Sequence, residues 1–519
     1  MKNWFNHISL LLPLGIYCIL WVLLNPYLGY MLDSDCVAYL TIANRILHGQ
    51  YLQSINGLWS PLNIWMIVPF MKNGMDGFEA AKLLNAFFGF IILIQVFFLF
   101  KKFKLQSFIT FILMISSAIT MAYFVYFQLF GDVLQLIFVL FYLFVLLSEK
   151  FYNQFWKVML CGFVMAIAYY AKAYSLVFFF LHFGVVLLWA FKNNKITFSK
   201  GIQYYFIGIF TALLFVLPWT YALHTKYNEW SLTGHAGKLN MSWYINSGKT
   251  FKKDLTLLIP PIYEDSPSFW EDPSLTQDNL SSPFSSPKHF VKWIARVIHT
   301  SLVAIMCFNE ISFLALAILI IGLFYFFFRT KDSYIQHFDT QIIILTILLL
   351  PLGYLMMHIE TRYIWLNTFL LMVLGALLIQ LIQPYFKRAL FTNLASILLG
   401  FSFIVYPILQ FDQLKYKNKS LFELSTELKK HEFKGKFTSN VVDAGNMWVI
   451  AYLTQSQFYT IEKTDYTIHE LKQEMNRYQV DQFIYSIENN IGNTLIQDSS
   501  FTLLYSIGST DIYQFKLDK

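Results

Sequence analysis

The chain has 519 residues, of which 57% are hydrophobic, 19% aromatic and only 13% charged, whereas about 25% of the residues in an ordinary soluble domain are charged. This composition excludes a soluble protein and indicates a multi-pass membrane protein. The net charge of +7 does not indicate nucleic-acid binding, because the lysines and arginines gather in short clusters between apolar segments, where the positive-inside rule accounts for them.

Eleven apolar segments are long enough to span a membrane, which takes about 20 mostly apolar residues in a helix. They are 8–28, 78–100, 107–127, 132–148, 156–171, 173–191, 203–223, 309–328, 340–358, 363–381 and 389–410. The first segment lacks a small-residue cleavage site, so we expect a retained helix rather than a signal peptide. Two shorter stretches, 59–71 and 290–308, carry prolines or basic residues, and we expect them at the membrane interface.

Every second connection between these segments is basic. The basic residues are Lys2; Lys101, Lys102 and Lys104; Lys150 and Lys157; Lys192, Lys195 and Lys200; Arg329 and Lys331; and Lys387 and Arg388. Basic connections tend to face the cytoplasm. We therefore expect a plasma (inner) membrane protein with a cytoplasmic N-terminus, and with the loops 29–77 and 224–308 and the tail outside.

The composition changes at residue 411, which divides the chain into a membrane domain (1–410) and a tail domain (411–519). Strand-like runs at 437–442, 457–461, 482–486, 501–506 and 512–515 alternate with helical patterns at 447–454 and 467–478. This alternation predicts a small soluble α/β domain. It carries no phosphate-binding glycine fingerprint, so we assign it no chemistry.

The four cysteines, Cys18, Cys36, Cys161 and Cys307, show no paired spacing, and two of them fall within apolar spans. Neither a disulfide framework nor a metal site is indicated. A pair between Cys36 and Cys307 outside the membrane is the alternative.

Two carboxylates, Asp33 and Asp35, follow the first apolar span. The next residues show a helical pattern that ends at Gly49, with Thr41 and Arg45 among its polar positions, and we expect this helix to lie along a surface. Asp is a favoured N-cap residue, so capping alone is one explanation of the acids. One carboxylate suffices for a cap, however, and we expect the pair to include a general base. The sequence leaves open which acid has that role.

Four more ionisable residues are expected near the same outer face. Asp132 follows the turn FQLFG, Lys172 lies in AYYAKAYSL, and Glu360 and Arg362 lie in HIETRY. Charge at this depth is costly and usually functional, although a snorkelling lysine and a structural ion pair are the alternatives. Cations beside an apolar wall suit a lipid-linked phosphate, and a carboxylate suits a general base for a hydroxyl. Together they favour sugar transfer from a polyprenyl phosphate.

The chain resembles the GT-C superfamily of integral-membrane glycosyltransferases, in particular the branch with the protein O-mannosyltransferases and the lipid A aminoarabinose transferase. The motifs that carry this resemblance are DSDCVAYLTIANRILHGQY (33–51), WSPL (59–62), GDVL (131–134), AYYAKAY (168–174), LPW (217–219) and ETRY (360–363). They occur in one order and on one predicted side of the membrane. Many relatives carry the two acids side by side, whereas Ser34 separates them here.

The resemblance implies an all-α membrane domain of GT-C type with about 11 transmembrane helices, followed by the soluble α/β domain outside. It implies a donor sugar on a polyprenyl monophosphate, an acceptor hydroxyl on a lipid, glycan or protein, and inversion at the anomeric carbon. No nucleotide or other cofactor is implied, and a divalent metal is left open. The implied roles are general base for Asp35 or Asp33; phosphate binding for Lys172, Arg362 and Arg296; and support from Asp132, Glu360, Tyr363, Tyr39 and His235.

The long outer loop adds further candidates, for which a solvated face is the alternative. Candidates for the donor head group are His235, Lys238, Lys249, Lys252 and Lys253, and candidates for the acceptor or a metal are Glu264, Asp265, Glu271 and Asp272.

Two other functions share lipid-linked sugars. A flippase or transporter would favour charged or broken helices near mid-membrane and paired halves, which this sequence lacks. An outer-polysaccharide polymerase or ligase would need an arginine-rich outer loop, whereas residues 224–289 contain lysine but no arginine.

Overall fold

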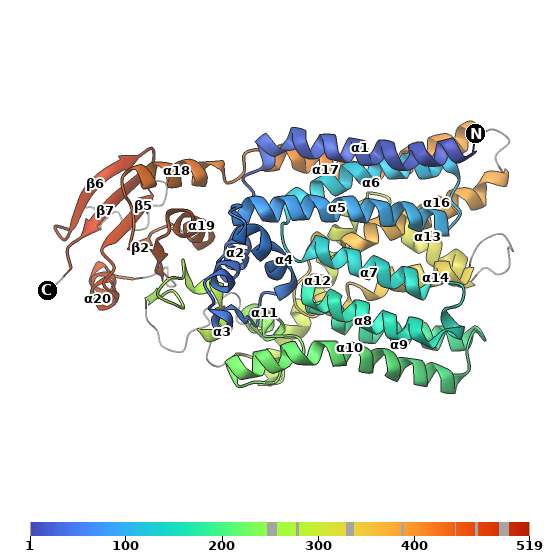
Figure 1. The fold of residues 1–519 in the computed structure, drawn as a ribbon, viewed down its shortest axis with the longest axis horizontal. Helices are drawn as coiled ribbons and strands as arrows, with labels where there is room; N and C mark the ends of the chain where they lie inside the picture. The colour runs from blue at the N-terminus through green and yellow to red at the C-terminus, as the bar shows by residue number, and fades with distance from the viewer. Residues whose placement is uncertain are drawn as a thin grey trace.

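The computed structural model describes residues 2–245, 257–276, 280–328, 337–385, 389–441, 443–461, 466–486 and 498–517. Apolar helices run side by side along the long axis, and a sheet-containing domain lies at one end (Figure 1). The chain begins at the opposite end of the bundle (Figure 1). The expected class, an all-α polytopic domain followed by a small α/β domain, is confirmed.

The membrane domain is mainly helical. Its α-helices are α1 (Lys2–Leu28), α2 (Ser34–Leu47), α3 (Tyr51–Ser54), α4 (Pro61–Lys72), α5 (Gly77–Lys102), α6 (Ser107–Phe127), α7 (Asp132–Leu146), α8 (Phe155–Ala171), α9 (Tyr174–Lys192), α10 (Phe198–Tyr227), α11 (Ala236–Ile245), α12 (Pro287–Ile311), α13 (Ala315–Phe328), α14 (His337–Leu349), α15 (Leu352–Leu355), α16 (Trp365–Ile382) and α17 (Ala389–Leu414). Short 3₁₀ helices are η1 (Phe151–Asn153), η2 (Phe269–Glu271), η3 (Pro273–Leu275), η4 (Thr361–Ile364) and η5 (Gln383–Tyr385).

Each of the eleven predicted apolar segments falls on helix in this domain, with 340–358 divided between α14 and α15. By length and composition, nine helical segments among the described residues can cross a membrane, and α7, α8 and α13 are shorter apolar helices. The prediction of eleven spans differs in two respects: α7, α8 and α13 were predicted as spans but are not among the nine, and α12, which was not, is one of them. Its basic residues suggested an interfacial stretch, but they lie in its first half, and the helix continues through an apolar second half to Ile311.

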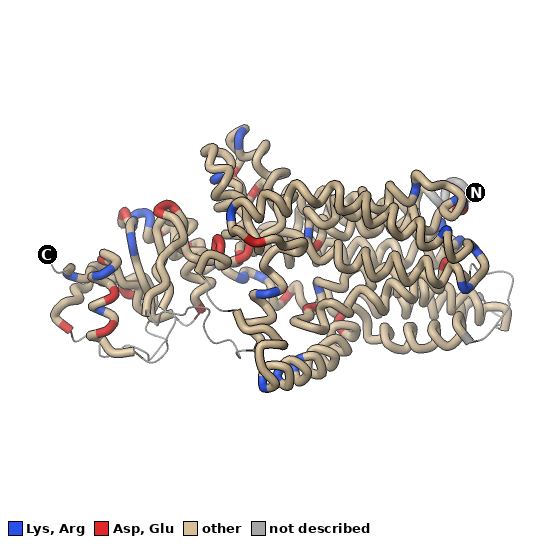
Figure 2. The backbone as a smooth tube through the Cα atoms, turned by 90° about the horizontal axis from the view of Figure 1, so that it is seen from below, with Lys and Arg blue, Asp and Glu red and all other residues tan. Residues whose placement is uncertain are grey.

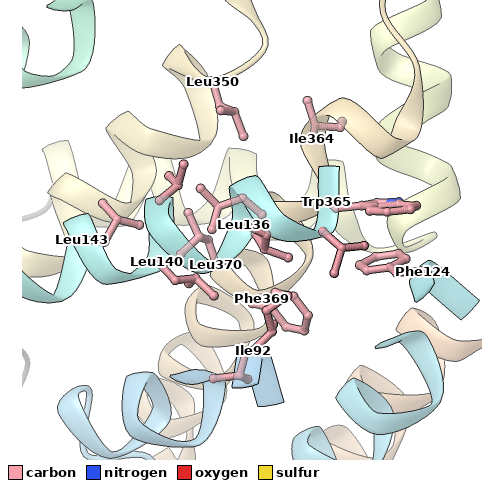
Figure 3. Close-up of a cluster of buried hydrophobic side chains, with 14 of the residues drawn as sticks. Ile92, Phe124, Leu136, Leu140, Leu143, Leu350, Ile364, Trp365, Phe369 and Leu370 are labelled. Carbon is pink, nitrogen blue, oxygen red and sulfur yellow. The ribbon is translucent and has the colours of Figure 1, made fainter. Parts of the chain in front are cut away.

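The centre of the bundle is a dense cluster of apolar side chains from α5, α6, α7 and α16 (Figure 3). The rings of Phe124 and Trp365 stack with centroids 3.9 Å apart, and both Trp365 and Phe369 are buried. α16 is apolar on every face, as expected for a helix at the centre of a bundle. Because Trp365 begins α16 directly after η4, this packing fixes the segment that carries Arg362.

The tail domain contains a five-stranded mixed sheet in the order β3-β2-β5-β7-β6. Its strands are β2 (Lys436–Ser439), β3 (Gln457–Phe458), β5 (Gln482–Ser486), β6 (Phe501–Ile507) and β7 (Thr510–Phe515), and its helices are α18 (Lys419–Lys430), α19 (Ala444–Thr454) and α20 (Ile468–Tyr478). β2 pairs in parallel with β3 and β5, and β7 pairs antiparallel with β5 and β6. Both predicted helices and the strands at 482–486, 501–506 and 512–515 are confirmed. The strand predicted at 437–442 ends at Ser439, and Val442 lies outside the described residues. The strand predicted at 457–461 is divided into β3 and a second short strand, β4 (Thr460–Ile461).

The tail domain is attached to the long loop 224–308, which we call the outer loop after its predicted side of the membrane. Strand β1 (Leu258–Ile259) of that loop pairs antiparallel with β4 (Thr460–Ile461) of the tail. The backbone N–H of Phe458 also donates to the carbonyl of Pro267 at 2.9 Å. The tail is thus docked on the end of the bundle that carries α2 (Figure 1).

Charge is distributed unevenly between the two ends of the bundle. Figure 2 shows Lys and Arg at both ends of the bundle, including a group near the N-terminus, whereas most Asp and Glu lie toward the tail domain. This distribution agrees with the basic alternation, and the orientation in the membrane stays a prediction. Seven lysines and arginines named above, Lys249, Lys252, Lys253, Arg329, Lys331, Lys387 and Arg388, lie outside the described residues. All four cysteines are free, so the alternative pair of Cys36 and Cys307 is not formed.

Candidate active site

A cavity of about 380 Å³ lies where α2, the start of α7, the connection from α8 to α9, α11 and η4 meet. Six predicted site residues line it, namely Asp35, Tyr39, Asp132, Lys172, Arg362 and Tyr363. They come from four separate parts of the sequence. The fold therefore brings together most of the residues that the sequence singled out.

The two acids before α2 have different positions. Asp33 is the N-cap of α2, and its Oδ1 accepts the backbone N–H of Cys36 at 2.7 Å. Asp35 lies in the first turn, its side chain is 28% exposed, and it lines the cavity. An N-cap side chain bonds back to its own helix, so Asp33 caps the helix whereas Asp35 is available to a ligand.

The environment of Asp35 suits a base that works near neutral pH. Burial raises the pKa of Asp35 to about 6, and the charge of Asp33 raises it too, whereas Arg362 and a hydrogen bond from Trp270 act in the opposite direction. Oδ2 of Asp35 lies 4.0 Å from Nη2 of Arg362. A general base is most effective when its pKa is close to the working pH.

Two cations lie opposite this acid. Lys172 ends α8, where its extended backbone breaks the helix, and its ammonium forms an ion pair with Asp132 and lies 3.9 Å from the ring centroid of Tyr363. Nη1 of Arg362 is 3.9 Å from Oδ2 of Asp132. The side chains of Lys172 and Arg362 are 20% and 14% exposed. Lys172 therefore faces the interior of the protein rather than lipid head groups.

A glycine turn places Asp132 in this group. Gly131 precedes α7 with a φ of 79°, a conformation that glycine adopts at little cost. The chain reverses there, so that Asp132 begins the helix beside Lys172. The GDVL motif therefore has a structural reason for its glycine and a cavity-facing role for its acid.

Aromatic rings form much of the cavity wall. Tyr39 stacks on Phe130 with centroids 4.5 Å apart and packs against Trp59 at 5.5 Å. On the other side, Tyr354 stacks on Tyr363 at 4.5 Å. Stacked rings have few rotamers and keep their shape. The charged groups are thus held on a rigid aromatic support.

Three predicted residues lie near the cavity without being among its described lining residues. Arg296 donates from Nε to the carbonyl of Met357 at 3.0 Å, so it holds the wall from behind. Glu360 forms an ion pair with Arg362 at 2.8 Å. Burial raises the pKa of Glu360, but hydrogen bonds with His358 and Arg362 outweigh it and lower the pKa to about 2. His235 packs edge-on against Tyr227.

The acids of the outer loop belong to a different group. Buried Arg45 of α2 donates from Nη2 to Oε2 of Glu271 at 2.8 Å and from Nη1 to Oδ1 of Asp265 at 2.9 Å. Lys226 pairs with buried Asp272 at 2.6 Å. Asp265, Glu271 and Asp272 are thus engaged in ion pairs, and their expected role toward an acceptor or metal stays a prediction. Lys238 forms an exposed pair with Glu229 at 2.6 Å, which fits a solvated face.

The expectation that α2 lies along a surface is wrong for much of the helix. Thr41 and Arg45 are both buried, because the outer loop and the tail domain cover α2. Sequence reasoning also missed Trp270, whose indole reaches Asp35. No local pattern distinguishes this tryptophan from the others. The EDSPSFWED run offered only its density of acids as a signal.

No group of three or more His, Cys, Asp or Glu side chains is arranged as metal ligands within the part of the chain that the structure describes. The acids of the cavity are paired with Lys172 and Arg362 instead.

No protein-family model and no curated protein matches this chain. Among solved structures, an oligosaccharyltransferase from Archaeoglobus fulgidus, in complex with Zn and sulfate, aligns with a TM-score of 0.56 and 9% identity, over 97% of this chain and 72% of that chain. ArnT from Cupriavidus metallidurans aligns with a TM-score of 0.47 and 9% identity when bound to undecaprenyl phosphate, and with 0.45 and 10% in the apo state, over 97% of both chains.

At 9% identity, the likeness to the oligosaccharyltransferase shows the fold alone. Fold and activity are separate questions, because one fold hosts many functions. The agreement extends over nearly the whole chain, tail domain included. The chain therefore has the same fold as this oligosaccharyltransferase. That likeness supports the GT-C-type membrane fold that the motifs predicted.

Proposed function

We propose that this protein is a membrane glycosyltransferase. It takes a sugar from a polyprenyl-phosphate donor and transfers it, with inversion, to an acceptor hydroxyl at the outer face of the membrane. The observation that carries the proposal is a single cavity in which a carboxylate near neutral pKa, Asp35, lies opposite two cations, Lys172 and Arg362. The fold of the chain supports the same class of activity.

The arrangement divides the reaction into two halves. Asp35 takes the proton from the acceptor hydroxyl as its oxygen forms a bond to the anomeric carbon. The bond from that carbon to the phosphate oxygen breaks, and the polyprenyl phosphate leaves with the electron pair. Lys172 and Arg362 stabilise the negative charge of the leaving phosphate, which needs no proton. One base and two cations are therefore sufficient.

An apolar groove supports a lipid-linked donor. It has a volume of about 580 Å³ and lies between α9 and α10, with Leu181, Leu188, Phe198 and Phe206 among its walls. Val177 lines both this groove and the cavity. The prenyl chain of a phosphate held at Lys172 would thus lie next to this groove at Val177.

The same residues favour phosphate binding without a metal. Both cations already face the place where a phosphate would lie, and the two cavity acids are paired with them. A chelator such as EDTA should accordingly leave donor binding and transfer unchanged. A loss of transfer that is restored by Mg²⁺ or Mn²⁺ would contradict this part of the proposal.

The decisive experiment compares lipid binding by the purified full chain. Undecaprenyl phosphate should bind more tightly than undecaprenyl diphosphate, which suits a polymerase or ligase, and more tightly than dioleoyl phosphatidic acid, which has the phosphate without the prenyl chain. A glycolipid and glycoprotein mass profile of cells with wild-type protein or Asp35→Asn would then identify the product. Equal affinity for all three lipids, together with an unchanged profile, would overturn the proposal.

A further inference from the structure

Trp270 of η2 connects the cavity acid to the tail domain. Its indole Nε1 donates a hydrogen bond to Oδ1 of Asp35 at 3.3 Å. Its ring stacks on Trp448 of α19, with centroids 5.0 Å apart and planes inclined by 15°. Trp59 of the cavity wall donates from Nε1 to the carbonyl of Trp270 at 3.3 Å. Trp270 thus contacts the acid and the tail domain through its side chain, and the cavity wall through its backbone carbonyl.

Both tryptophans are themselves held in place. Trp448 is buried and donates from Nε1 to Thr460 at 3.2 Å, in the strand that pairs with the outer loop. The residue after Trp270 is Glu271, which pairs with buried Arg45 of α2. Side chains whose partners are fixed on both sides have little freedom to rotate. The indole hydrogen bond to Asp35 is therefore preorganised.

The tail domain also packs directly on the helix that carries the acid. α19 contacts α2, and a Cβ atom added at Gly445 would lie 3.7 Å from the side chain of Ser34. Ser34 is the residue that separates the two acids. The tail domain thus borders the first turn of α2, where Asp35 lies.

We propose that the tail domain is a working part of the active site, in which the stacked pair Trp448 and Trp270 holds the carboxylate of Asp35 in position to accept the proton of the acceptor. This inference rests on the function proposed above, because it gives Asp35 the role of base. Trp270 and Trp448 are positioning residues: they act through Asp35 and not on the substrate directly.

The hydrogen bond has a measurable electrostatic effect. A donor to an ionised carboxylate favours the ionised form, so Trp270 lowers the pKa of Asp35, against burial and Asp33, which raise it. Other titratable groups on the elements around Asp35 are Cys36 and Tyr39 of α2, Asp132 and Lys172, Glu360 and Arg362, Glu271 beside Trp270, and Asp443 at the start of α19. Removing the indole N–H leaves these groups unchanged, so the pKa of Asp35 should rise.

The test measures the protonation of Asp35 without any substrate. The purified full chain is treated with a water-soluble carbodiimide and an amine at a series of pH values, and the modification of Asp35 is measured by mass spectrometry of peptides. In Trp270→Phe the midpoint of Asp35 should rise by about one pH unit, the size expected for one hydrogen bond to a charged group. Trp448→Ala should raise it in the same direction, and Trp448→Phe should restore most of the wild-type value.

The matched control is Trp230→Phe, since Trp230 is an exposed tryptophan of the same outer loop that stacks on His224. In Trp230→Phe, the midpoint for modification of Asp35 should equal that of the wild type. Melting midpoints of all variants establish that they are folded. Variants of Trp270 and of Trp448 test the same contact from two domains. If a variant at one position fails to fold, the variant at the other position still tests the inference.

Wild-type midpoints in both Trp270→Phe and Trp448→Ala would overturn this inference. That outcome differs from a failure of the proposed function, which would appear as full transfer by Asp35→Asn.

Discussion

The chain contains two groups in which buried cations are paired with acids. The two groups differ in how much open space remains beside the cations. In the first, Arg45 is 2% exposed, and its guanidinium is bonded to Glu271, Asp265, Gln50 and Ser266. In the second group the cations face a cavity: Lys172 pairs with Asp132, and Arg362 pairs with Glu360 at 2.8 Å. Asp35 lies 4.0 Å from Arg362 and has no closer ion pair among the described residues.

The difference shows how to separate a structural ion pair from a binding site. A saturated group has no capacity left for a ligand, and breaking it leaves an unpaired buried charge. A group that lines a cavity has space beside its cations and can rearrange around an incoming anion at lower cost. We therefore expect mutations in the first group to reduce stability and mutations in the second to reduce binding and rate.

The largest expected effect is that of Asp35→Asn. Asparagine cannot accept a proton, and losing a general base costs about 10²- to 10⁴-fold in rate. Transfer should fall by this factor, while the melting midpoint and the affinity for undecaprenyl phosphate stay near those of the wild type. Asp33→Asn is the control, because asparagine is also a good N-cap, and it should retain most of its activity. Equal losses in both variants would contradict the separate roles of the two acids.

Glu271→Gln should have the largest effect on stability. Removing one partner of a buried ion pair costs about 3 to 5 kcal/mol, and the pair of Arg45 with Glu271 is the most buried one described at the outer loop. Denaturation of the full chain in detergent should show this loss. The control Glu229→Gln breaks an exposed pair with Lys238, which should cost less than about 1 kcal/mol. Similar stability of the two variants would remove the distinction between the groups.

Lys172→Gln should weaken the binding of undecaprenyl phosphate by at least about tenfold, because a charge-assisted contact contributes about 1.5 to 3 kcal/mol. Equilibrium binding in detergent measures this loss. Arg296→Gln is the comparison within the same region, since Arg296 holds the cavity wall through the carbonyl of Met357, and its effect on affinity should be clearly smaller. If Arg296→Gln proves the more damaging change, the phosphate lies elsewhere than proposed.

The pH dependence gives the smallest expected effect. Asp35 must be ionised to accept a proton, and its pKa is raised to about 6 by burial and by Asp33. Activity should therefore be nearly full at pH 7.5 and fall as the pH drops through 6, to about one-tenth at pH 5. Initial rates of transfer at fixed donor saturation provide the measurement. A rate that stays constant down to pH 4.5 would mean that Asp35 is not the base.

The class of the molecule and the charged residues of the cavity, namely Asp35, Asp132, Lys172 and Arg362, were predictable from the sequence alone. In a bilayer, a long apolar run can form its backbone hydrogen bonds only as a helix. Short strands that alternate with helices, as in the tail, can be packed in few ways other than a small α/β domain. Charged residues at the ends of apolar spans, Lys172 and Arg362 above all, are costly enough to stand out without any structure.

Which residues are buried and which partners they contact became visible only in the tertiary structure, because local sequence patterns do not contain this information. Asp33 and Asp35 have similar neighbours in the sequence, and only the orientation of α2 makes one a cap and the other a cavity residue. Arg45 and Trp270 show their roles only when segments more than 200 residues apart meet. Burial and partner geometry depend on which elements pack together, and such contacts between distant segments leave no periodic signal along the chain.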